Sequence, residues 1–214
     1  PPAVLLAFWG LETDFGGNTG QYRAAEALAT LAYDSRRGTF FRTELLALLD
    51  LMQAGDVPVD ARASWAGALG QMQFMPTTYR SYAVDFDGDG RRDLWRSMAD
   101  AFASAANYLA SIGWDGASPW GQEVRLPADF DYYLSGLDGE LPVSAWRDLG
   151  VVAASGRTLD GGSRPASILL PGGAEGGPAL MIFPNFRVIM TWNRAIPYAV
   201  TVGHLADRIG GRGP

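Results

Sequence analysis

The chain has 214 residues, enough for one sizeable hydrophobic core or for a core with a small lobe. Hydrophobic residues make up 48% and charged residues 19%, which is typical of a folded protein. The net charge of −6, with no long basic run, argues against nucleic-acid binding. The absence of cysteine excludes thiolate chemistry, and the single histidine, His204, disfavours a Ser-His-Asp triad or a His-rich zinc site.

The longest apolar run, Pro1 to Trp9, is too short to span a bilayer. It also lacks the basic segment and the cleavage site of a signal peptide. Because the chain begins inside a helical pattern, we expect that the N-terminal part of the full protein is missing. Any export signal or membrane anchor would lie in that part.

Apolar residues recur at helical spacing in two parts of the chain, and the composition changes between them. The predicted helices cover about residues 1–16, 24–33, 40–54, 98–112, 143–149, 186–193 and 197–209, and a further short helix is predicted to begin at 76–79. Two strands are predicted at 167–170 and 180–183, around a Gly- and Pro-rich loop at 171–178. The fold class is therefore mainly α. We expect a single domain over 1–214, with a helical core at about 1–114 and 184–210 and a small loop and β-hairpin insertion at about 115–183.

Glu12 is the first candidate for chemistry. It ends an apolar and aromatic run, Phe8-Trp9-Gly10-Leu11-Glu12, on a helix expected to stop about one turn later at Gly16-Gly17. Apolar surroundings raise the pKa of a carboxyl group, and a carboxylic acid that is protonated near neutral pH suits general-acid catalysis. The simpler alternative is a surface glutamate or an ion-pair partner of Arg36 or Arg37.

The acidic loop, defined here as residues 85–97, begins with the sequence Asp85-Phe86-Asp87-Gly88-Asp89-Gly90-Arg91. Acids at alternate positions with a glycine at the sixth resemble an EF-hand calcium loop. Position 12 is Arg96 rather than a bidentate glutamate, and Asp100 is the nearest later acid. An acidic turn without a metal is the alternative.

The segment from Ser64 to Pro76 is rich in glycine, alanine and glutamine. Small residues allow the backbone to approach a ligand, and glutamine side chains both donate and accept hydrogen bonds with sugars. Tight packing between helices would explain the same composition. Likewise, Arg36-Arg37 is either a solvated pair or an anchor for an anionic ligand, and the abundant aromatic residues either stack on sugars or fill the core. For His204 a structural role is favoured.

These stretches resemble, in the same order, the membrane-bound lytic murein transglycosylase B family, glycoside hydrolase family 103. The resemblance rests on Phe8 to Gly16, Ser64 to Pro76 and Asp85 to Trp95, with later similarity at Asn107-Tyr108-Leu109 and around Trp192 to Val200. It implies a lysozyme-like helical core that acts on the glycan strands of peptidoglycan. We therefore expect a monomeric protein of the bacterial periplasm, held by a membrane anchor in the missing N-terminal part.

The resemblance also assigns roles to individual residues. It makes Glu12 the catalytic acid and base, and it requires no cofactor for the chemistry. It places a structural calcium ion at Asp85, Asp87, Asp89, Arg91 and Asp100. The predicted substrate-binding residues are Arg36, Arg37, Ser64, Gln71, Gln73, Phe74, Tyr108, Asn193 and Tyr198. Which of Gln71 and Gln73 faces the sugar stays open.

The number of carboxylates near Glu12 bears on the mechanism. An ordinary glycosidase needs two carboxylates, whereas the sequence offers only Asp14 near Glu12. Asp14 lies two residues further along the helix, so its side chain points to a different side. The resemblance implies a single acid that protonates the leaving oxygen and then deprotonates the C6 hydroxyl of the same sugar. The product is a 1,6-anhydromuramyl end. The alternatives are a hydrolysing muramidase and a non-catalytic glycan-binding module.

Overall fold

The computed structural model describes residues 1–174 and 176–211. Glu175, in the predicted 171–178 loop, and residues 212–214 lie outside the described residues. The chain divides into two compact units, which are described separately. The first unit contains Pro1–Ser111 and the segment from Ala206 onward, and the second contains Ile112–Leu205.

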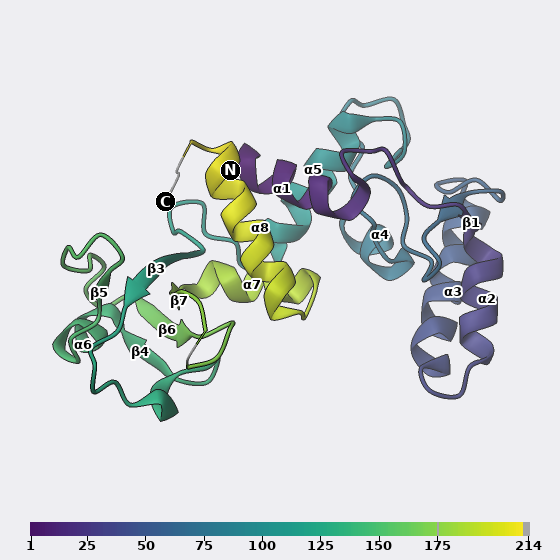
Figure 1. The fold of residues 1–214 in the computed structure, drawn as a ribbon. Helices are drawn as coiled ribbons and strands as arrows, with labels where there is room; N and C mark the ends of the chain where they lie inside the picture. The colour runs from purple at the N-terminus through teal and green to yellow at the C-terminus, as the bar shows by residue number, and fades with distance from the viewer. Residues whose placement is uncertain (175, 212–214) are drawn as a thin grey trace. The chain divides into compact units, whose positions relative to one another are not determined.

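The first unit is helical, apart from one short pair of strands. Its elements are α1 (Pro2–Thr13), β1 (Tyr22–Arg23), α2 (Ala24–Tyr33), α3 (Gly38–Ala54), β2 (Arg62–Ala63), α4 (Pro76–Tyr82) and α5 (Met98–Ser111) (Figure 1). The helices predicted at 24–33, 40–54 and 98–112 are confirmed to within two residues. Helix α1 ends earlier than predicted, at Thr13, because Asp14 adopts a left-handed conformation with φ of 52°.

Helices α2 and α3 lie side by side (Figure 1). Helix α3 in turn packs on α4. Glu44 of α3 is buried and stabilises the start of α4. Its carboxylate accepts hydrogen bonds from the Thr77 backbone N–H at 2.9 Å and from the Thr77 hydroxyl at 2.8 Å. A side chain from one helix thus satisfies a donor that the first turn of the next helix leaves unpaired.

Each of the three motifs of the first unit contributes buried side chains. The largest fully buried side chains of this unit are Phe8, Leu28, Leu48, Leu69, Met72, Phe74, Tyr79 and Leu94. They come from α1, α2, α3, α4, the 64–76 segment and the acidic loop. The three stretches that carry the sequence resemblance therefore all help to form the interior of the first unit.

The second unit contains a sheet. Its elements are β3 (Gly121–Arg125), η1 (Tyr132–Leu134), β4 (Glu140–Pro142), α6 (Val143–Asp148), β5 (Val152–Ala153), β6 (Pro165–Leu169), β7 (Ala179–Ile182) and α7 (Pro184–Trp192). Helix α8 (Ile196–Ile209) begins in this unit and ends in the first. The five strands are antiparallel in the order β4-β6-β7-β3-β5 (Figure 1).

The two predicted strands are present as β6 and β7, which pair with each other. They lie within a sheet of five strands rather than in a lone hairpin, so the prediction of a small hairpin was incomplete. Two of the missed strands, β4 and β5, have only three and two residues, and strands this short show no clear alternation in sequence. The third, β3, has five residues, but its sequence Gly-Gln-Glu-Val-Arg contains a single apolar side chain.

Trp146 of α6 lies at the centre of the second unit's core. Its side chain is fully buried among Val124, Ile168, Met181 and other apolar residues of the sheet. Its indole Nε1–H donates a hydrogen bond to the Ala166 carbonyl at 2.9 Å. The indole therefore contributes both buried apolar area and a satisfied polar group.

We expect Trp146→Ala to lower the free energy of unfolding by about 3–5 kcal/mol, because it leaves a large cavity and an unpaired carbonyl. Chemical denaturation measures this change. The matched control is Tyr133→Ala, because the Tyr133 side chain is 99% exposed. The control should change the stability by less than about 0.5 kcal/mol. Equal effects of the two substitutions would contradict the assignment of this core.

Candidate functional site

The end of α1 places Glu12 at a sharp turn. Glu12 is the last helical residue but one, and Asp14 and Phe15 follow Thr13 with φ angles of 52° and 54°. Two successive left-handed non-glycine residues are uncommon and need support from their surroundings. Gly16 continues the turn with φ of 85°.

Part of this support comes from aromatic packing. The Phe15 ring lies against Gly10, where a Cβ atom would approach the Phe15 Cζ to 2.7 Å. The Trp9 ring makes edge contacts with Phe15 and with Phe102 of α5, each with a centroid distance of 5.4 Å. Gly10 is therefore required for Phe15 to fold back over the helix.

The remaining support consists of hydrogen bonds. The buried Thr13 hydroxyl lies 3.1 Å from the Trp9 carbonyl and 3.0 Å from the Gln71 carbonyl, and it accepts a hydrogen bond from the Gly16 N–H at 3.1 Å. The Gln71 side-chain carbonyl accepts a hydrogen bond from the Trp9 indole at 2.8 Å. The turn that follows Glu12 is thus fixed by aromatic packing and by hydrogen bonds.

Glu12 lines a cavity of about 280 Å³ in the first unit. The wall is made by residues from the end of α1, from the loop before β1, from β1 itself and from the 64–76 segment. They are Glu12, Asn18, Gly20, Gln21, Tyr22, Ser64, Trp65 and Gln73. Among these described residues, Glu12 is the only carboxylic acid.

The β1–β2 pairing brings two walls of the cavity together. Tyr22 pairs with Ala63, next to Ser64. Gly20, with φ of 107°, lies so close to this segment that a Cβ atom would be 2.0 Å from the Ala63 carbonyl carbon. Only glycine permits this approach of the two backbones.

Two of the predicted substrate-binding residues, Ser64 and Gln73, lie in the cavity wall. The Ser64 Oγ accepts hydrogen bonds from the N–H groups of Ala66 and Ala68, at 3.3 and 3.0 Å, which leaves its own proton available to a ligand. The Gln73 Nε2 donates to the carbonyls of Thr19 and Gly70, at 3.2 and 2.9 Å. Its Oε1 accepts no hydrogen bond from the described residues and is available to a sugar hydroxyl.

Gln71 is placed differently. Its Nε2 donates a hydrogen bond to the Trp95 carbonyl at 2.9 Å while its Oε1 binds the Trp9 indole. Both ends of the amide are therefore used within the protein, and Gln71 is not among the residues that line the cavity. Of the two glutamines between which the sequence did not distinguish, the structure puts Gln73 in the cavity.

Phe74 and Tyr108 also lie outside the cavity wall. Phe74 is buried and packs edge-on against Tyr108 at a centroid distance of 5.7 Å. Tyr108 in turn packs on Tyr82, with centroids 4.7 Å apart. Burial, and to a lesser degree the neighbouring Tyr82, raises the pKa of Tyr108, so its hydroxyl stays protonated at neutral pH.

Arg36 and Arg37 lie in the connection between α2 and α3, and neither lines the cavity. The Arg36 guanidinium forms an exposed ion pair with Asp34, with an N–O distance of 3.0 Å. Hydrogen bonds from Arg36 lower the pKa of Asp34. The Arg37 guanidinium lies over the rings of Phe40 and Phe41, at 4.7 and 5.3 Å.

Asn193 and Tyr198 belong to the second unit. Asn193 follows the end of α7, and its Oδ1 accepts a hydrogen bond from the Ala195 N–H at 3.1 Å. Tyr198 lies in the first turn of α8. His204, which the sequence assigned to a structural role, makes an edge contact with Trp120 at a centroid distance of 5.2 Å.

Sequence reasoning missed two aromatic residues of the cavity. Tyr22 and Trp65 line it, and their side chains are 59% and 66% exposed. Other aromatic side chains of the chain are more exposed, such as Tyr33 at 95%, so their shared place in the cavity wall, rather than exposure alone, marks Tyr22 and Trp65. The signal in the sequence was weak, because the chain has many aromatic residues and exposure is visible only in the structure.

The acidic loop brings three carboxylates together. Asp85, Asp87 and Asp100 each offer an oxygen, and these oxygens lie within 4.8 Å of one another. Asp100 is fully buried and accepts hydrogen bonds from the backbone N–H groups of Phe86 and Asp93, at 2.8 and 2.9 Å. The late acid that sequence analysis selected by resemblance thus reaches the loop.

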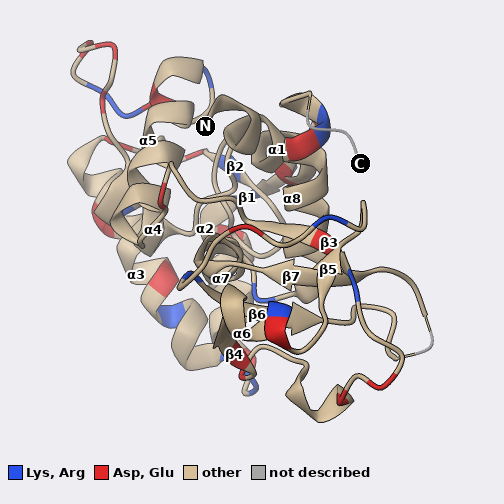
Figure 2. Cartoon of the chain, turned by 90° about the vertical axis from the view of Figure 1, so that its left-hand side faces the viewer, with Lys and Arg blue, Asp and Glu red and all other residues tan. Residues whose placement is uncertain are grey.

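The other two predicted calcium ligands, Asp89 and Arg91, are not part of this cluster. The Asp89 carboxylate accepts a hydrogen bond from the Arg91 N–H at 2.8 Å. Acidic and basic residues are interspersed along the loop (Figure 2). Even so, among the described residues no arginine forms an ion pair with Asp85, Asp87 or Asp100. Three close carboxylates without a cationic side chain paired to them fit the oxygen ligands that Ca²⁺ prefers.

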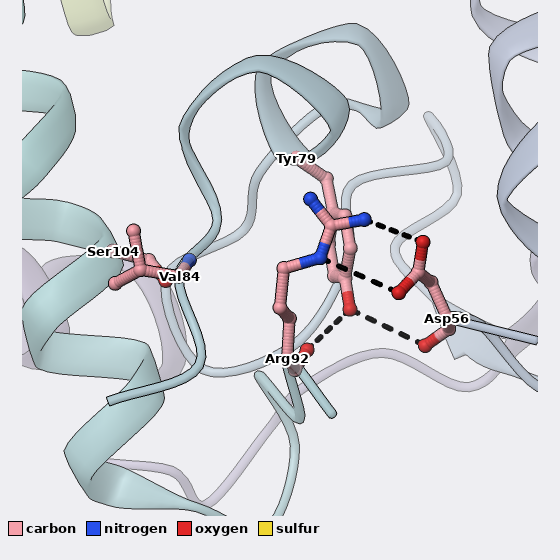
Figure 3. Close-up of polar contacts among 5 residues, drawn as sticks. All are labelled: Asp56, Tyr79, Val84, Arg92 and Ser104. Atoms are coloured by element: carbon pink, nitrogen blue, oxygen red, sulfur yellow. Dashed lines mark hydrogen bonds and ion pairs between the residues drawn. The ribbon is translucent and has the colours of Figure 1, made fainter. Parts of the chain in front are cut away.

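The acidic loop is held to the rest of the unit on both sides (Figure 3). At its start, the Val84 N–H donates a hydrogen bond to the Ser104 hydroxyl at 2.9 Å. Further on, the Arg92 guanidinium forms an ion pair with Asp56 and lies over the Tyr79 ring, and the buried Tyr79 hydroxyl donates to the Arg92 carbonyl. Burial and the nearby Asp56 carboxylate raise the pKa of Tyr79, so the hydroxyl remains a donor.

Comparison with known sequences gives two matches that bear on this site. The family described as Transglycosylase SLT domain matches residues 1–207. Membrane-bound lytic murein transglycosylase B of Escherichia coli (strain K12) is 34% identical over 219 residues, covering 98% of this chain and 57% of that protein. Among the described residues, no helix has both the length and the apolar character that crossing a membrane requires.

Solved structures of lytic transglycosylases are also similar to this chain. SltB3 from Pseudomonas aeruginosa, in complex with NAG-anhNAM-pentapeptide, has a TM-score of 0.94 at 48% identity, covering 98% of this chain and 56% of that one. The Escherichia coli lytic transglycosylase Slt35, in complex with calcium, has a TM-score of 0.84 at 31% identity, covering 99% and 67%. The chain thus has the lysozyme-like fold of lytic transglycosylases and spans little more than half the length of the first relatives. The resemblance of its motifs is confirmed, and the chain belongs to the Transglycosylase SLT domain family.

Proposed function

We propose that this chain is the catalytic part of a lytic murein transglycosylase. It cleaves the β-1,4 bond between N-acetylmuramic acid and N-acetylglucosamine and leaves a 1,6-anhydromuramyl end. The observation that carries the proposal is the cavity in which Glu12 is the only carboxylic acid among the described residues. Support comes from SltB3 of Pseudomonas aeruginosa, whose structures contain NAG-anhNAM-pentapeptide and NAG-NAM-pentapeptide.

A single carboxyl group suffices when the substrate supplies the nucleophile. Glu12 donates its proton to the leaving oxygen as the bond from C1 to that oxygen breaks. The N-acetyl carbonyl of the muramic acid stabilises the positive charge at C1. The Glu12 carboxylate then takes the proton of the C6 hydroxyl while O6 bonds to C1, which regenerates the acid. Because O6 belongs to the same sugar, its high effective concentration replaces a second protein carboxylate and water.

The other groups of the cavity position the sugar. The Ser64 hydroxyl donates a hydrogen bond, and the free Gln73 Oε1 accepts one from the sugar. Tyr22 and Trp65 present aromatic faces to the sugar rings. Tyr108, Asn193, Tyr198, Arg36 and Arg37 stay predicted substrate contacts, and Phe74 supports the ring of Tyr108. Since the substrate belongs to the bacterial cell envelope, we infer a periplasmic location, with an anchor outside this chain.

We expect Glu12→Gln to reduce cleavage of peptidoglycan at least about 1,000-fold, because the amide can neither donate nor accept the proton. Turnover of soluble glycan strands and circular dichroism measure activity and folding together. The matched control is Asp14→Asn, which removes the neighbouring carboxylate. It should retain activity, because Asp14 does not line the cavity. Loss of activity in the control alone would contradict the single-acid mechanism.

We expect Trp65→Ala to raise KM for glycan strands about tenfold with little change in kcat, because a stacking surface worth about 1.4 kcal/mol is lost. Steady-state kinetics on soluble strands measure both constants. Trp65→Phe should keep most of the affinity, since it retains an aromatic face. A fall in kcat with unchanged KM would show that Trp65 does not act as a binding surface.

We also propose that the acidic loop holds a structural calcium ion through Asp85, Asp87 and Asp100, with Asp89 and the Arg91 carbonyl as further ligands. Support comes from the three close carboxylates and from Slt35, which was solved with calcium. The ion supplies no step of the reaction. It offsets the repulsion among the carboxylates and thereby stabilises the loop.

We expect saturating Ca²⁺ to raise the Tm of the chelated protein by roughly 5–10 °C, because an ion at about 100 times its Kd stabilises the folded state by about 2.7 kcal/mol. Differential scanning calorimetry measures this shift. Asp87→Asn should reduce the shift, whereas Asp60→Asn, an exposed acid of the same unit, should leave it unchanged. An unchanged Tm of the wild-type protein on adding Ca²⁺ would leave the loop as an acidic turn.

A further inference from the structure

Gln71 makes four hydrogen bonds that connect two distant segments of the first unit. Its Oε1 accepts from the Trp9 indole at 2.8 Å, and its backbone carbonyl accepts from the Thr13 hydroxyl at 3.0 Å. Its Nε2 donates to the Trp95 carbonyl at 2.9 Å, and its backbone N–H donates to the Leu94 carbonyl at 2.7 Å. The two acceptor groups thus hold the end of α1, and the two donors hold the end of the acidic loop.

Glu12 lies between the two residues of α1 that Gln71 holds. Trp9 is one turn before Glu12, and Thr13 follows it directly. The Gln71 amide also lies against the turn itself, since a Cβ atom on Gly16 would be 2.6 Å from its Oε1. A shift of Gln71 would therefore displace the segment that sets the position of the Glu12 carboxylate.

The hydrogen bonds from Gln71 to the acidic loop fix the orientation of its side-chain amide. An amide presents an acceptor at one end and a donor at the other, and here the acceptor meets an indole N–H and the donor meets a carbonyl. Gly70, next in the chain, has φ of 68° and lies so close to Leu94 that a Cβ atom would be 2.5 Å from its carbonyl oxygen. The Gly70–Gln71 backbone is thus pressed against the acidic loop and cannot move independently of it.

We propose that Gln71 is a positioning residue for Glu12, which it holds in place by bridging the end of α1 to the end of the acidic loop. This inference rests on the proposed function, because it concerns the residue that we assign as the acid and base. Gln71 does not line the cavity, and both ends of its amide are bound within the protein, so we expect no contact with the substrate. Its loss should therefore affect the transition state, in which Glu12 must be aligned, more than binding.

The first test is Gln71→Met, which keeps a similar side-chain volume and removes both side-chain hydrogen bonds. We expect kcat on soluble glycan strands to fall about 100-fold with KM within about twofold, because small misplacements of a catalytic group cost this much. The matched control is Gln122→Met in β3, whose amide makes one weak contact, with the Met181 sulfur at 3.9 Å. This control should keep the wild-type kcat.

The second test, Gln71→Glu, separates positioning from a general loss of stability. The ionised carboxylate accepts from the Trp9 indole but faces the Trp95 carbonyl without a proton, whereas the protonated acid restores both hydrogen bonds. The ratio of the variant's kcat to the wild-type kcat should therefore rise as the pH falls. The same ratio for Gln71→Met should stay flat, and circular dichroism should show folded protein throughout.

A direct structural readout accompanies the kinetics. The Trp9 indole N–H resonance, assigned with Trp9→Phe, should shift and exchange faster with solvent in Gln71→Met, because its acceptor is lost. The inference is overturned if Gln71→Met lowers the Tm but keeps kcat, or if KM rises while kcat is unchanged. It is also overturned if the Gln71→Glu ratio is independent of pH, a result that does not require Gln71→Met to fold.

Failure of this inference is distinguishable from failure of the proposed function. If Glu12→Gln is inactive and Gln71→Met is fully active, only the positioning role of Gln71 is lost. If Glu12→Gln remains active, the proposed acid and base is wrong, whatever Gln71 does.

Discussion

The hydrogen bond between the Trp9 indole and the Gln71 amide is the interaction on which the candidate site depends. Helix α1 ends in two left-handed residues, Asp14 and Phe15, a conformation that needs support from other parts of the unit. Gln71 of the 64–76 segment gives part of that support by accepting a hydrogen bond from the Thr13 hydroxyl, and the same segment supplies Ser64 and Gln73 to the cavity. The 64–76 segment therefore shapes the wall of the cavity and also fixes Glu12, the only carboxylic acid among the described residues that line it.

The acidic loop is joined to the same segment, which links the candidate calcium site to the cavity. The loop packs Leu94 into the interior, and its carbonyl groups at 94 and 95 accept hydrogen bonds from Gln71. Its Arg92 is held by Asp56 and Tyr79 (Figure 3). A calcium ion that orders this loop would stabilise the surroundings of Glu12 without contacting the substrate.

Much of this arrangement was predictable from sequence, and the remainder follows from contacts that no pattern encodes. Helical spacing identified α2, α3 and α5, and the resemblance selected Glu12, Ser64 and Gln73 for the cavity. The five-stranded sheet was underestimated because its outer strands, β4 and β5, are too short to show alternation and because β3 has one apolar side chain in five residues. The choice between Gln71 and Gln73 stayed open because a glutamine in a glycine-rich segment has the same signature whether it faces a ligand or bridges two backbones. Tyr22 and Trp65 were missed because exposure requires the folded chain.

The central claim is that one carboxyl group suffices because the substrate's own C6 hydroxyl replaces water. Digestion of purified peptidoglycan in H₂¹⁸O, followed by mass spectrometry of the products, tests this claim most directly. The account predicts 1,6-anhydromuramyl ends without ¹⁸O. Reducing muramic acid ends that carry one ¹⁸O atom would contradict it and would identify the chain as a hydrolysing muramidase.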